Sequence, residues 1–215
     1  MKTLLIYSGG MDSSTLLYDL LSQGHEVSTM SFNYKQRHGK ELLAAEKVAA
    51  LAGVPWELID LSSVAPLLSG SSQSDPSVPV PVGRYDEPSM KQTVVPNRNM
   101  IMLAIAGAAA IARRMDAVVY GAHAGDHAIY PDCREPFVKA MASAFELCDW
   151  HRLKLLAPYL TWTKGDICKR GLELNVPFAD TWTCYVGDDE PCGRCGACTE
   201  RAEAFSFMNT NDPLS

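Results

Sequence analysis

The first 21 residues constrain the fold more than any other stretch, because they join a buried strand to a helix through two adjacent glycines. Residues 4–7 are apolar, residues 8–13 are SGGMDS, and residues 15–21 have the apolar spacing of a helix. Gly9 and Gly10 can adopt backbone angles closed to other residues, which lets successive N–H groups converge on one anion. The following helix adds its unpaired N–H groups and the positive end of its dipole. This stretch therefore predicts a polyphosphate site.

The loop differs from two familiar phosphate-binding motifs. It lacks the Gly-Lys-Ser/Thr ending of a Walker A loop and the Gly-x-Gly-x-x-Gly of a dinucleotide fold. Without that lysine, the loop is better suited to binding a pyrophosphate than to positioning a γ-phosphoryl group for transfer. SGGMDS resembles the SGGxDS loop of the PP-loop ATP pyrophosphatases, which adenylate a substrate and release pyrophosphate. The same residues would also form a tight turn with Asp12 or Ser13 as helix N-cap, and the two interpretations are compatible.

The rest of the chain alternates strand and helix patterns as a parallel sheet requires. Apolar runs predict strands over residues 2–7, 27–32, 56–61, 117–120 and 155–158. Apolar spacing of three and four residues predicts helices over residues 13–23, 39–52, 99–114, 135–148 and 164–174. This order predicts an α/β fold with a doubly wound, five-stranded parallel sheet. Ligands of such sheets bind beyond the carboxyl ends of the strands, so residues 8–12, 32–34 and 121–132 should line one pocket.

Two regions depart from the alternation. Residues 69–96 are rich in Ser and Pro and are too long for an ordinary connection, which predicts either a functional lid or a partly disordered segment. After Phe178 the chain becomes turn-like and rich in cysteine. We therefore divide the chain into a nucleotide-binding domain, residues 1–178, and a small C-terminal zinc-binding region of helix and loop, residues 179–215.

Composition narrows the class of protein. The formal net charge is −6, from 19 Lys and Arg against 25 Asp and Glu, which makes nucleic acid a poor default partner. No stretch reaches the length of a membrane span, and the N-terminus does not have the pattern of a signal peptide. Seven cysteines without an export signal favour thiols or a metal over disulfides. We expect a cytoplasmic protein that does not bind membranes.

The cysteines of the C-terminal region have the spacing of a metal site. The four ligands would be Cys184, Cys192, Cys195 and Cys198. Four thiolates make a closed tetrahedral zinc site with no position left for water, so the metal would be structural and would hold a tail that has too little apolar content to fold alone. An iron–sulfur cluster, a redox pair and simple thiols are the alternatives. Cys148 and Cys168 lie in helical patterns and are predicted as core thiols, whereas the role of Cys133 stays open.

Six segments that span nearly the whole chain carry a more specific resemblance. They are SGGMDSS (8–14), FNYKQRH (32–38), VPNRN (95–99), GAHAGDHAIYPDCREPF (121–137), TWTCY (181–185) and CGRCGAC (192–198). The first is typical of the whole PP-loop superfamily, but YPDCR and the C-terminal cysteines make the match specific. Together the segments resemble the 7-cyano-7-deazaguanine synthase (QueC) family within that superfamily. The resemblance also implies an adenine-nucleotide α-hydrolase-like fold.

The resemblance implies a ligase that converts 7-carboxy-7-deazaguanine, ammonia and ATP into 7-cyano-7-deazaguanine, a step toward the queuosine nucleoside of tRNA. The implied intermediates are an adenylated acid and an adenylated amide, because a carboxylate oxygen leaves only when it is activated. The expected cofactors are Mg²⁺ near Asp12 and a structural Zn²⁺. No glutaminase segment fits in the remaining length, so free ammonia is the expected nitrogen source. A homodimer is implied by the resemblance alone.

Candidate residues follow from the pyrophosphate that both activations release. The ATP-binding set comprises Ser8, Gly9, Gly10, Met11, Asp12, Ser13, Ser14, Thr15, Leu16, Leu17 and Tyr18. The catalytic set comprises Asp12, Ser13, Lys164 and Arg98, since donors placed where charge develops should carry most of the rate.

The substrate-binding candidates are Phe32, Tyr34, Arg37, His123, Asp132 and Arg134. A deazaguanine presents N–H donors on its Watson–Crick edge, which a carboxylate such as Asp132 would accept. The aromatic residues could stack on a ring. His123 could transfer a proton or be an ordinary loop histidine, and Arg37 could be a solvated residue at a helix start.

Two rival functions remain. One is another PP-loop ligase or a tRNA-thiolating enzyme, which would want a basic surface and a reactive cysteine outside the zinc site. The other is a zinc-stabilised binding module that uses the nucleotide as a switch and releases no pyrophosphate.

Overall fold

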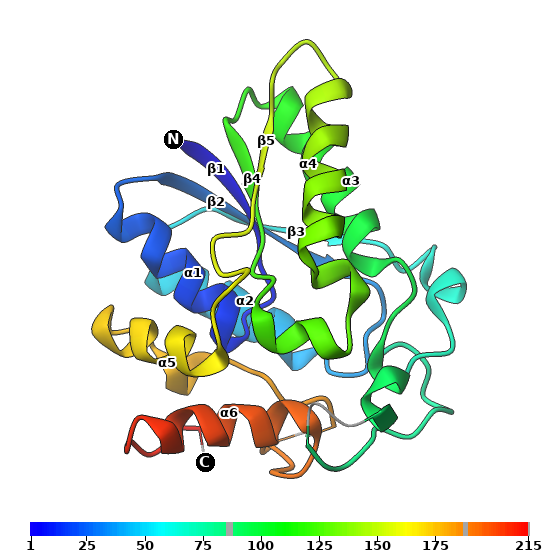
Figure 1. Ribbon diagram of the computed structural model, residues 1–215, viewed down its shortest axis with the longest axis vertical. Coiled ribbons are helices and arrows are strands. Elements are labelled where there is room, and N and C mark those ends of the chain that lie inside the picture. Colours follow the sequence, from blue (N-terminus) through cyan, green and yellow to red (C-terminus); the bar gives the residue numbers. More distant parts are fainter. Residues whose placement is uncertain (85–87, 187–188, 215) are drawn as a thin grey trace.

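Five strands form one parallel sheet in the order β3-β2-β1-β4-β5 (Figure 1). The strands are β1 Lys2–Ile6, β2 Glu26–Asn33, β3 Trp56–Asp60, β4 Ala117–Val119 and β5 Lys154–Leu156. Every pairing within this sheet is parallel. The computed structural model describes residues 1–84, 88–186 and 189–214. The predicted α/β class, sheet type and number of strands are confirmed.

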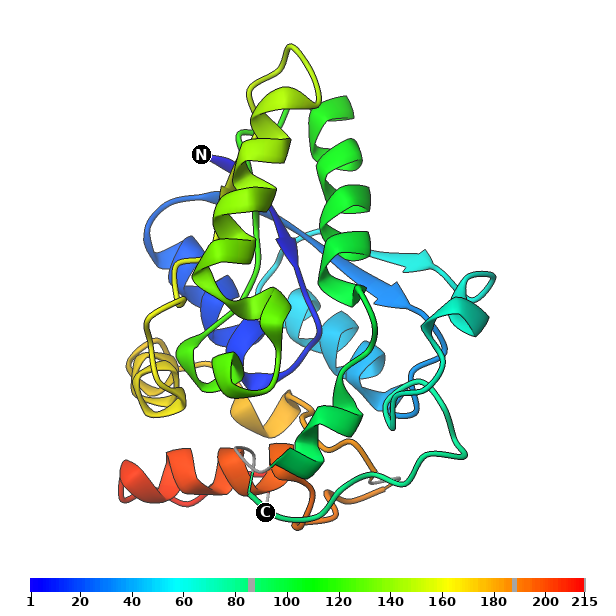
Figure 2. The same ribbon diagram turned by 45° about the vertical axis from the view of Figure 1, so that its right-hand side comes forward.

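Helices cover both faces of the sheet, as Figures 1 and 2 show. They are α1 Met11–Ser22, α2 Lys40–Leu51, α3 Arg98–Ala112, α4 Glu135–Leu147, α5 Lys164–Glu173 and α6 Gly196–Phe207. Successive side chains of a strand point to opposite faces. Leu4 of β1 accordingly belongs to the core under α3 and α4, and Leu5 belongs to the core under α1 and α2. The winding direction therefore changes between β1 and β4.

Helix α6 lies in the C-terminal region that was predicted to contain helix and loop, although no bounds were predicted for a helix there. It packs against α5, and Phe205 shares a small apolar cluster with Cys168 and Phe178. Short 3₁₀ turns complete the chain: η1 Ala65–Leu68, η2 Pro88–Thr93, η3 Ala124–Ala128, η4 Pro131–Cys133 and η5 Phe178–Asp180. The prediction of a core thiol is correct for Cys168 but wrong for Cys148, which is exposed because it lies at the end of α4.

The described residues of the segment 69–96 pack against the rest of the domain. Residues 85–87 lie outside the described part of the chain. Gln73 and Met90 are almost fully buried. The Arg37 guanidinium donates to the carbonyl oxygens of Pro76 and Val78 at 2.7 and 3.2 Å. These contacts give the described residues of the segment fixed positions, and a role as a lid stays a prediction.

The change of winding direction places a crevice at the carboxyl ends of β1 and β4, where ligands of open parallel sheets bind. The loops that follow β1, β2 and β4 meet there, and α6 lies across the same end of the molecule (Figure 1). Among the described residues, no helix has the length and apolar character that a membrane crossing requires.

Candidate active site

The loop after β1 is shaped by Gly9, which has a left-handed φ of +77°. A Cβ atom on Gly9 would lie only 2.4 Å from the Ala45 backbone nitrogen, so the loop can pack this closely against α2 only as glycine. The Trp182 backbone N–H donates to the Gly9 carbonyl at 3.0 Å and supports the loop from the C-terminal region. Helix α1 then begins at Met11 without a side-chain cap on its first N–H groups. Such a helix start attracts an anion.

Lys164, the first residue of α5, enters the crevice beside this loop. Its Nζ lies 2.6 Å from Asp12 Oδ2 and 3.2 Å from Glu200 Oε2. Burial alone would lower the pKa of Lys164, but the two carboxylates raise it above its ordinary value. Burial alone would raise the pKa of Asp12, but Lys164 and His123 lower it well below the usual range. Asp12 and Lys164 are therefore a partly buried ion pair.

His123, in the loop after β4, lies on the other side of Asp12. Its Nε2 is 3.6 Å from Asp12 Oδ2 and 3.5 Å from Asp126 Oδ2, and its Nδ1 accepts the Gly125 N–H at 3.1 Å. Burial alone would lower the pKa of His123, but Asp126 and Asp12 raise it to about 9. The two carboxylates favour the protonated imidazole at neutral pH. In that form Nδ1 carries a hydrogen and cannot accept the Gly125 N–H, so this contact belongs to the neutral ring and opposes protonation in part.

The carboxylates of this end of the crevice fit a divalent cation. Asp12 Oδ1 is buried and has no hydrogen-bond partner among the described residues. Asp126 and Glu200 add further carboxylate oxygens close by. Hard cations such as Mg²⁺ take oxygen ligands of this kind, so the donor set suits the predicted Mg²⁺.

The crevice continues from the loop into a second compartment beyond β2. Arg98, the first residue of α3, is in contact with Tyr34 OH at 3.4 Å and with Gln73 Oε1 at 3.1 Å through its Nη1. The side chains of Phe32 and Glu41 line the same compartment. The two compartments form one cavity of about 220 Å³.

The structure brings together ten of the predicted site residues and places nine others outside the cavity lining. The lining contains Ser8, Gly10, Met11, Asp12, Ser13, Phe32, Tyr34, Arg98, His123 and Lys164. The predicted residues outside it are Gly9, Ser14, Thr15, Leu16, Leu17, Tyr18, Arg37, Asp132 and Arg134. Asp132 Oδ2 instead accepts the Asn99 N–H at 3.3 Å, at the start of α3. Arg134 donates to the His127 carbonyl at 2.7 Å.

Several lining residues were not among the sequence candidates: Glu41, His38, Gln73, Cys133, Tyr185 and Glu200. His38 lies in the FNYKQRH segment, which is the signal that could have found it. Glu200 has no such signal, because its place depends on how α6 packs. Burial and the carboxylates of Asp126 and Asp132 raise the pKa of Cys133, so its thiol stays protonated and is a poor nucleophile.

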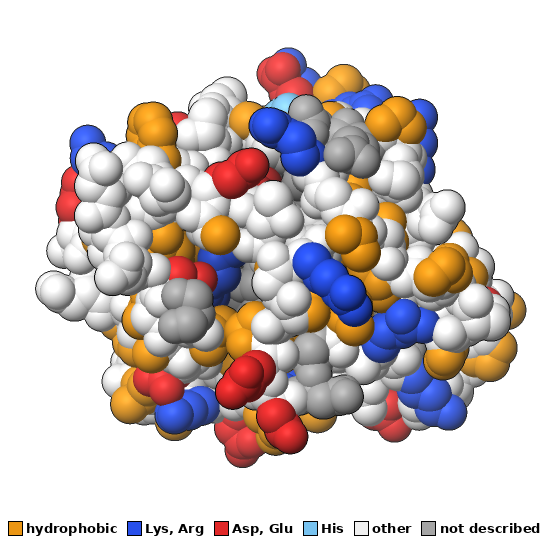
Figure 3. Space-filling model, turned by 90° about the horizontal axis from the view of Figure 1, so that it is seen from below, with side chains coloured by type: hydrophobic (Ala, Val, Ile, Leu, Met, Phe, Trp, Pro, Cys, Tyr) orange, Lys and Arg blue, Asp and Glu red, His pale blue; other side chains and the backbone are white. Residues whose placement is uncertain are grey.

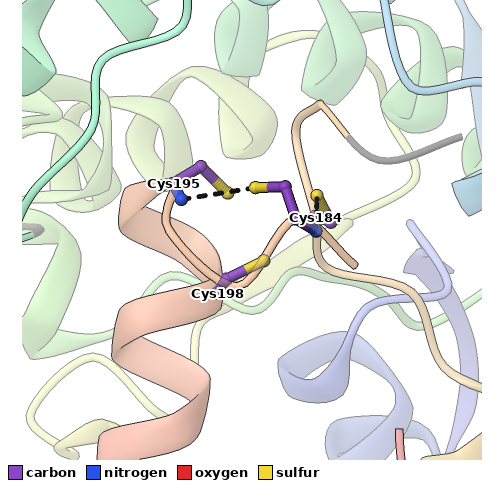
Figure 4. A group of neighbouring side chains, drawn as sticks. Cys184, Cys195 and Cys198 are labelled. Atoms are coloured by element: carbon purple, nitrogen blue, oxygen red, sulfur yellow. Dashed lines mark hydrogen bonds between the residues drawn. The ribbon is translucent and has the colours of Figure 1, made fainter. Parts of the chain in front are cut away.

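The four C-terminal cysteines gather as predicted, and their sulfurs lie within 4.8 Å of one another. Figure 4 shows Cys184, Cys195 and Cys198 converging at the start of α6. The Cys184 sulfur accepts backbone N–H groups from Val186 and Cys192, both at 3.3 Å. Such bonds favour the thiolate form that binds metal. Sulfurs of a tetrahedral zinc site are about 3.8 Å apart, so the donor set fits zinc.

Two solved structures share the fold. One is titled "The crystal structure of predicted subunit of tRNA methyltransferase from Methanocaldococcus jannaschii DSM"; it matches with a TM-score of 0.52 and 13% identity over 99% of this chain and 90% of that chain. The other, "Crystal structure of a 4-thiouridine synthetase - RNA complex with bound ATP", matches with a TM-score of 0.50 and 18% identity over 95% of this chain and 53% of that chain. This chain therefore has the α/β fold of these two structures, and the glycine loop at its crevice resembles the loop of the PP-loop superfamily.

Sequence relatives identify the family within that superfamily. The profile described as "Queuosine biosynthesis protein QueC" matches residues 2–209. A 7-cyano-7-deazaguanine synthase of Methanoregula boonei is 54% identical over 100% of this chain and 98% of its own length. One from Caldicellulosiruptor bescii is 51% identical over 100% of this chain and 96% of its own. The chain therefore belongs to the 7-cyano-7-deazaguanine synthase family of queuosine biosynthesis, whose members are enzymes.

Proposed function

We propose that the protein converts 7-carboxy-7-deazaguanine, ammonia and ATP into 7-cyano-7-deazaguanine. One observation carries the proposal: a single cavity joins the glycine loop, with its Asp12–Lys164 ion pair, to a compartment lined by Phe32, Tyr34 and Arg98. Chemistry at a carboxyl group of a flat heterocycle needs both parts. The loop supplies the place where a polyphosphate leaves, and the second compartment supplies faces and donors for a ring.

The reaction requires two activations. A carboxylate oxygen attacks the α-phosphorus of ATP and pyrophosphate leaves; ammonia then attacks the acyl carbon, AMP leaves, and the amide forms after a proton is lost. The amide oxygen attacks a second ATP in the same way. The adenylated amide loses one proton from nitrogen, and loss of AMP together with the second N–H proton then leaves the C≡N bond. Each activation moves negative charge onto pyrophosphate, so donors fixed at that position lower both barriers.

The chain's own residues supply those donors. The N–H groups at the start of α1, which have no side-chain cap, and the Ser8 and Ser13 hydroxyls would bind the leaving pyrophosphate. Lys164 adds a cation that Asp12 and Glu200 already hold in place, so little reorganisation is needed during the reaction. His123 holds a proton beside the same loop and can pass it to a leaving oxygen.

The two metals have separate tasks in this proposal. Asp12, with Asp126 or Glu200, would hold Mg²⁺, which supplies charge neutralisation on the polyphosphate when bound. The four cysteines would hold a structural Zn²⁺. Nothing in the cysteine set leaves a position for water.

The testing experiment is mass spectrometry of the products formed from 7-carboxy-7-deazaguanine, ammonium, Mg²⁺ and ATP. We expect the nitrile with two AMP per turnover and a transient amide. Nitrile with ADP would keep the overall reaction but refute the role of the loop. Turnover of neither deazaguanine nor ATP would refute the proposal and favour the other PP-loop ligases or a nucleotide-switched binding module.

We also propose the two-part division at residue 178, a cytoplasmic location, a homodimer and no nucleic-acid partner. The face seen from below in Figure 3 carries Asp and Glu side chains as well as Lys and Arg, which suits a small-molecule enzyme better than one that grips a phosphate backbone. Sedimentation of the purified protein tests the dimer. A single species at the mass of one chain would contradict it.

A further inference from the structure

One carboxylate in the cavity has no role in the chemistry described above. Among the described lining residues, the carboxyl side chains are Asp12, Glu41, Asp126 and Glu200. Three of them gather around Lys164 and His123 at the end where pyrophosphate would leave. Glu41 belongs to a different cluster, in the first turn of α2 beyond the end of β2.

Neighbouring side chains hold the Glu41 carboxylate in a fixed position. Its Oε1 accepts Gln36 Nε2 at 2.9 Å, and its Oε2 lies 3.2 Å from His38 Nε2. Gln36 is fixed in turn, because it donates to the Phe32 carbonyl and accepts the Tyr34 N–H, both at 3.0 Å. The orientation of Glu41 is therefore tied to the residues that end β2.

Glu41 remains an acceptor after these contacts. Burial alone would raise its pKa, but His38 and Gln36 lower it below the ordinary value, so the group is ionised at neutral pH. Each carboxylate oxygen has two lone-pair directions, and each uses one of them here. Two parallel N–H donors could therefore bind to the carboxylate, and its side chain, 16% exposed, lines the cavity.

We infer that Glu41 recognises the N1–H and 2-amino edge of the deazaguanine ring, an inference that rests on the proposed function. The 7-carboxyl group must face the glycine loop to be activated, which turns the pyrimidine edge of the ring away from that loop. This edge presents two adjacent N–H donors, which pair with two carboxylate oxygens in a bidentate, charge-assisted contact. Glu41, rather than Asp132 as predicted from the sequence, would thus be the carboxylate that binds this edge.

The same geometry excludes adenine as the group that Glu41 reads. The corresponding edge of adenine offers one amino donor beside a bare ring nitrogen, and a carboxylate repels that lone pair. Glu41 would therefore help the enzyme to distinguish its substrate ring from the ring of ATP. Arg98 lines the same compartment, and its charge helps to lower the pKa of the Glu41 carboxyl; it would be the donor for a 6-oxo group.

Equilibrium binding tests the inference without catalysis. The variant Glu41→Gln keeps the size of the side chain and replaces one acceptor with an N–H₂ group that opposes the donors of the ring. Titration calorimetry would measure 7-carboxy-7-deazaguanine, its analogue without the 2-amino group, and ATP. Glu46→Gln, at an exposed position of the same helix, is the matched control. Thermal denaturation would report whether each variant is folded.

We expect Glu41→Gln to weaken deazaguanine binding about 10- to 100-fold, the effect of losing a hydrogen bond to a charged group, with ATP binding unchanged. The wild type and Glu46→Gln should favour the 2-amino compound over its analogue, and Glu41→Gln should lose most of that preference. Unchanged deazaguanine affinity, or a loss confined to ATP, would overturn the role of Glu41 alone. Failure of the wild type to bind either compound would overturn the proposed function together with this inference.

Discussion

Replacing Gly9 with alanine should damage both the stability and the activity of the protein. Gly9 has a φ of +77°, and its Cβ position lies 2.4 Å from the Ala45 nitrogen and 2.5 Å from the Glu41 carbonyl oxygen. Both obstructing atoms belong to the backbone of α2, so neither can move away by rotating a side chain. The loop must therefore shift away from α2.

The magnitude follows from two separable costs. A non-glycine residue in the left-handed region costs about 1–2 kcal/mol. Relief of the contact with α2 requires a displacement of roughly 1 Å to reach ordinary van der Waals separation, and overpacking of this kind costs about 1–3 kcal/mol more. We expect Gly9→Ala to lower the free energy of unfolding by about 2–5 kcal/mol. A 1 Å misplacement of catalytic groups should also lower kcat about 100-fold.

Gly24→Ala is the matched control, because Gly24 has a φ of +75° and nothing within 4 Å of its Cβ position. Gly24→Ala should lower the free energy of unfolding only by the cost of the left-handed backbone, about 1–2 kcal/mol, and should keep its activity. The assays are urea denaturation and the rate of pyrophosphate release for both variants. Equal stability losses in the two variants, together with unchanged turnover in Gly9→Ala, would refute the close packing of the loop against α2.

Three further predictions concern the site and the cysteines. Lys164→Met should lower kcat/KM about 10²- to 10³-fold through the lost charge, as steady-state pyrophosphate release would show, and a loss below threefold would contradict that role. The pKa of His123 is raised from 6.5 to about 9 in the folded protein. Protonated His123 therefore contributes fully to the free energy of unfolding below pH 6.5, and this contribution is lost as the pH rises through 9. By 1.36 kcal/mol per pKa unit this amounts to about 3 kcal/mol, so urea denaturation at pH 6 and 9.5 without nucleotide should show a larger difference in the wild type than in His123→Gln. Cys198→Ser should lower bound zinc and expose residues 179–214 to protease, and full zinc content with unchanged digestion would count against the metal site.

The fold was predictable because its signals are local. Each strand is a short apolar run bounded by turn residues, and the order of strands and helices allows few arrangements. The bounds of helix α6 within the C-terminal region were not predicted, because its residues lack a clear apolar stripe and its position depends on the cysteine cluster and on packing against α5. Its extent is thus a consequence of tertiary contacts.

The candidate site was predictable only in part, for a related reason. The glycine loop belongs to a recognisable pattern and lies where a parallel sheet places ligands, and Lys164 is the first residue of a predicted helix. Asp132 also lies in a recognisable pattern, but its carboxylate accepts the Asn99 N–H at the start of α3. That helix begins after Asn97, which is in the left-handed region and provides no side-chain cap, so an external acceptor serves the free N–H group. The sequence does not show which carboxylate fills that role and which one faces the cavity.

The cysteine-rich region lines the cavity and also contacts the glycine loop. The Trp182 N–H supports the glycine loop through the Gly9 carbonyl, and Trp182 lies two residues before the first cysteine of the cluster. Glu200 lies two residues after the last cysteine and contacts Lys164 at 3.2 Å. A metal bound by the four sulfurs would hold one end of this segment against the glycine loop and the other end against Lys164. A metal with no coordination site for substrate would therefore still determine how well the catalytic groups are placed.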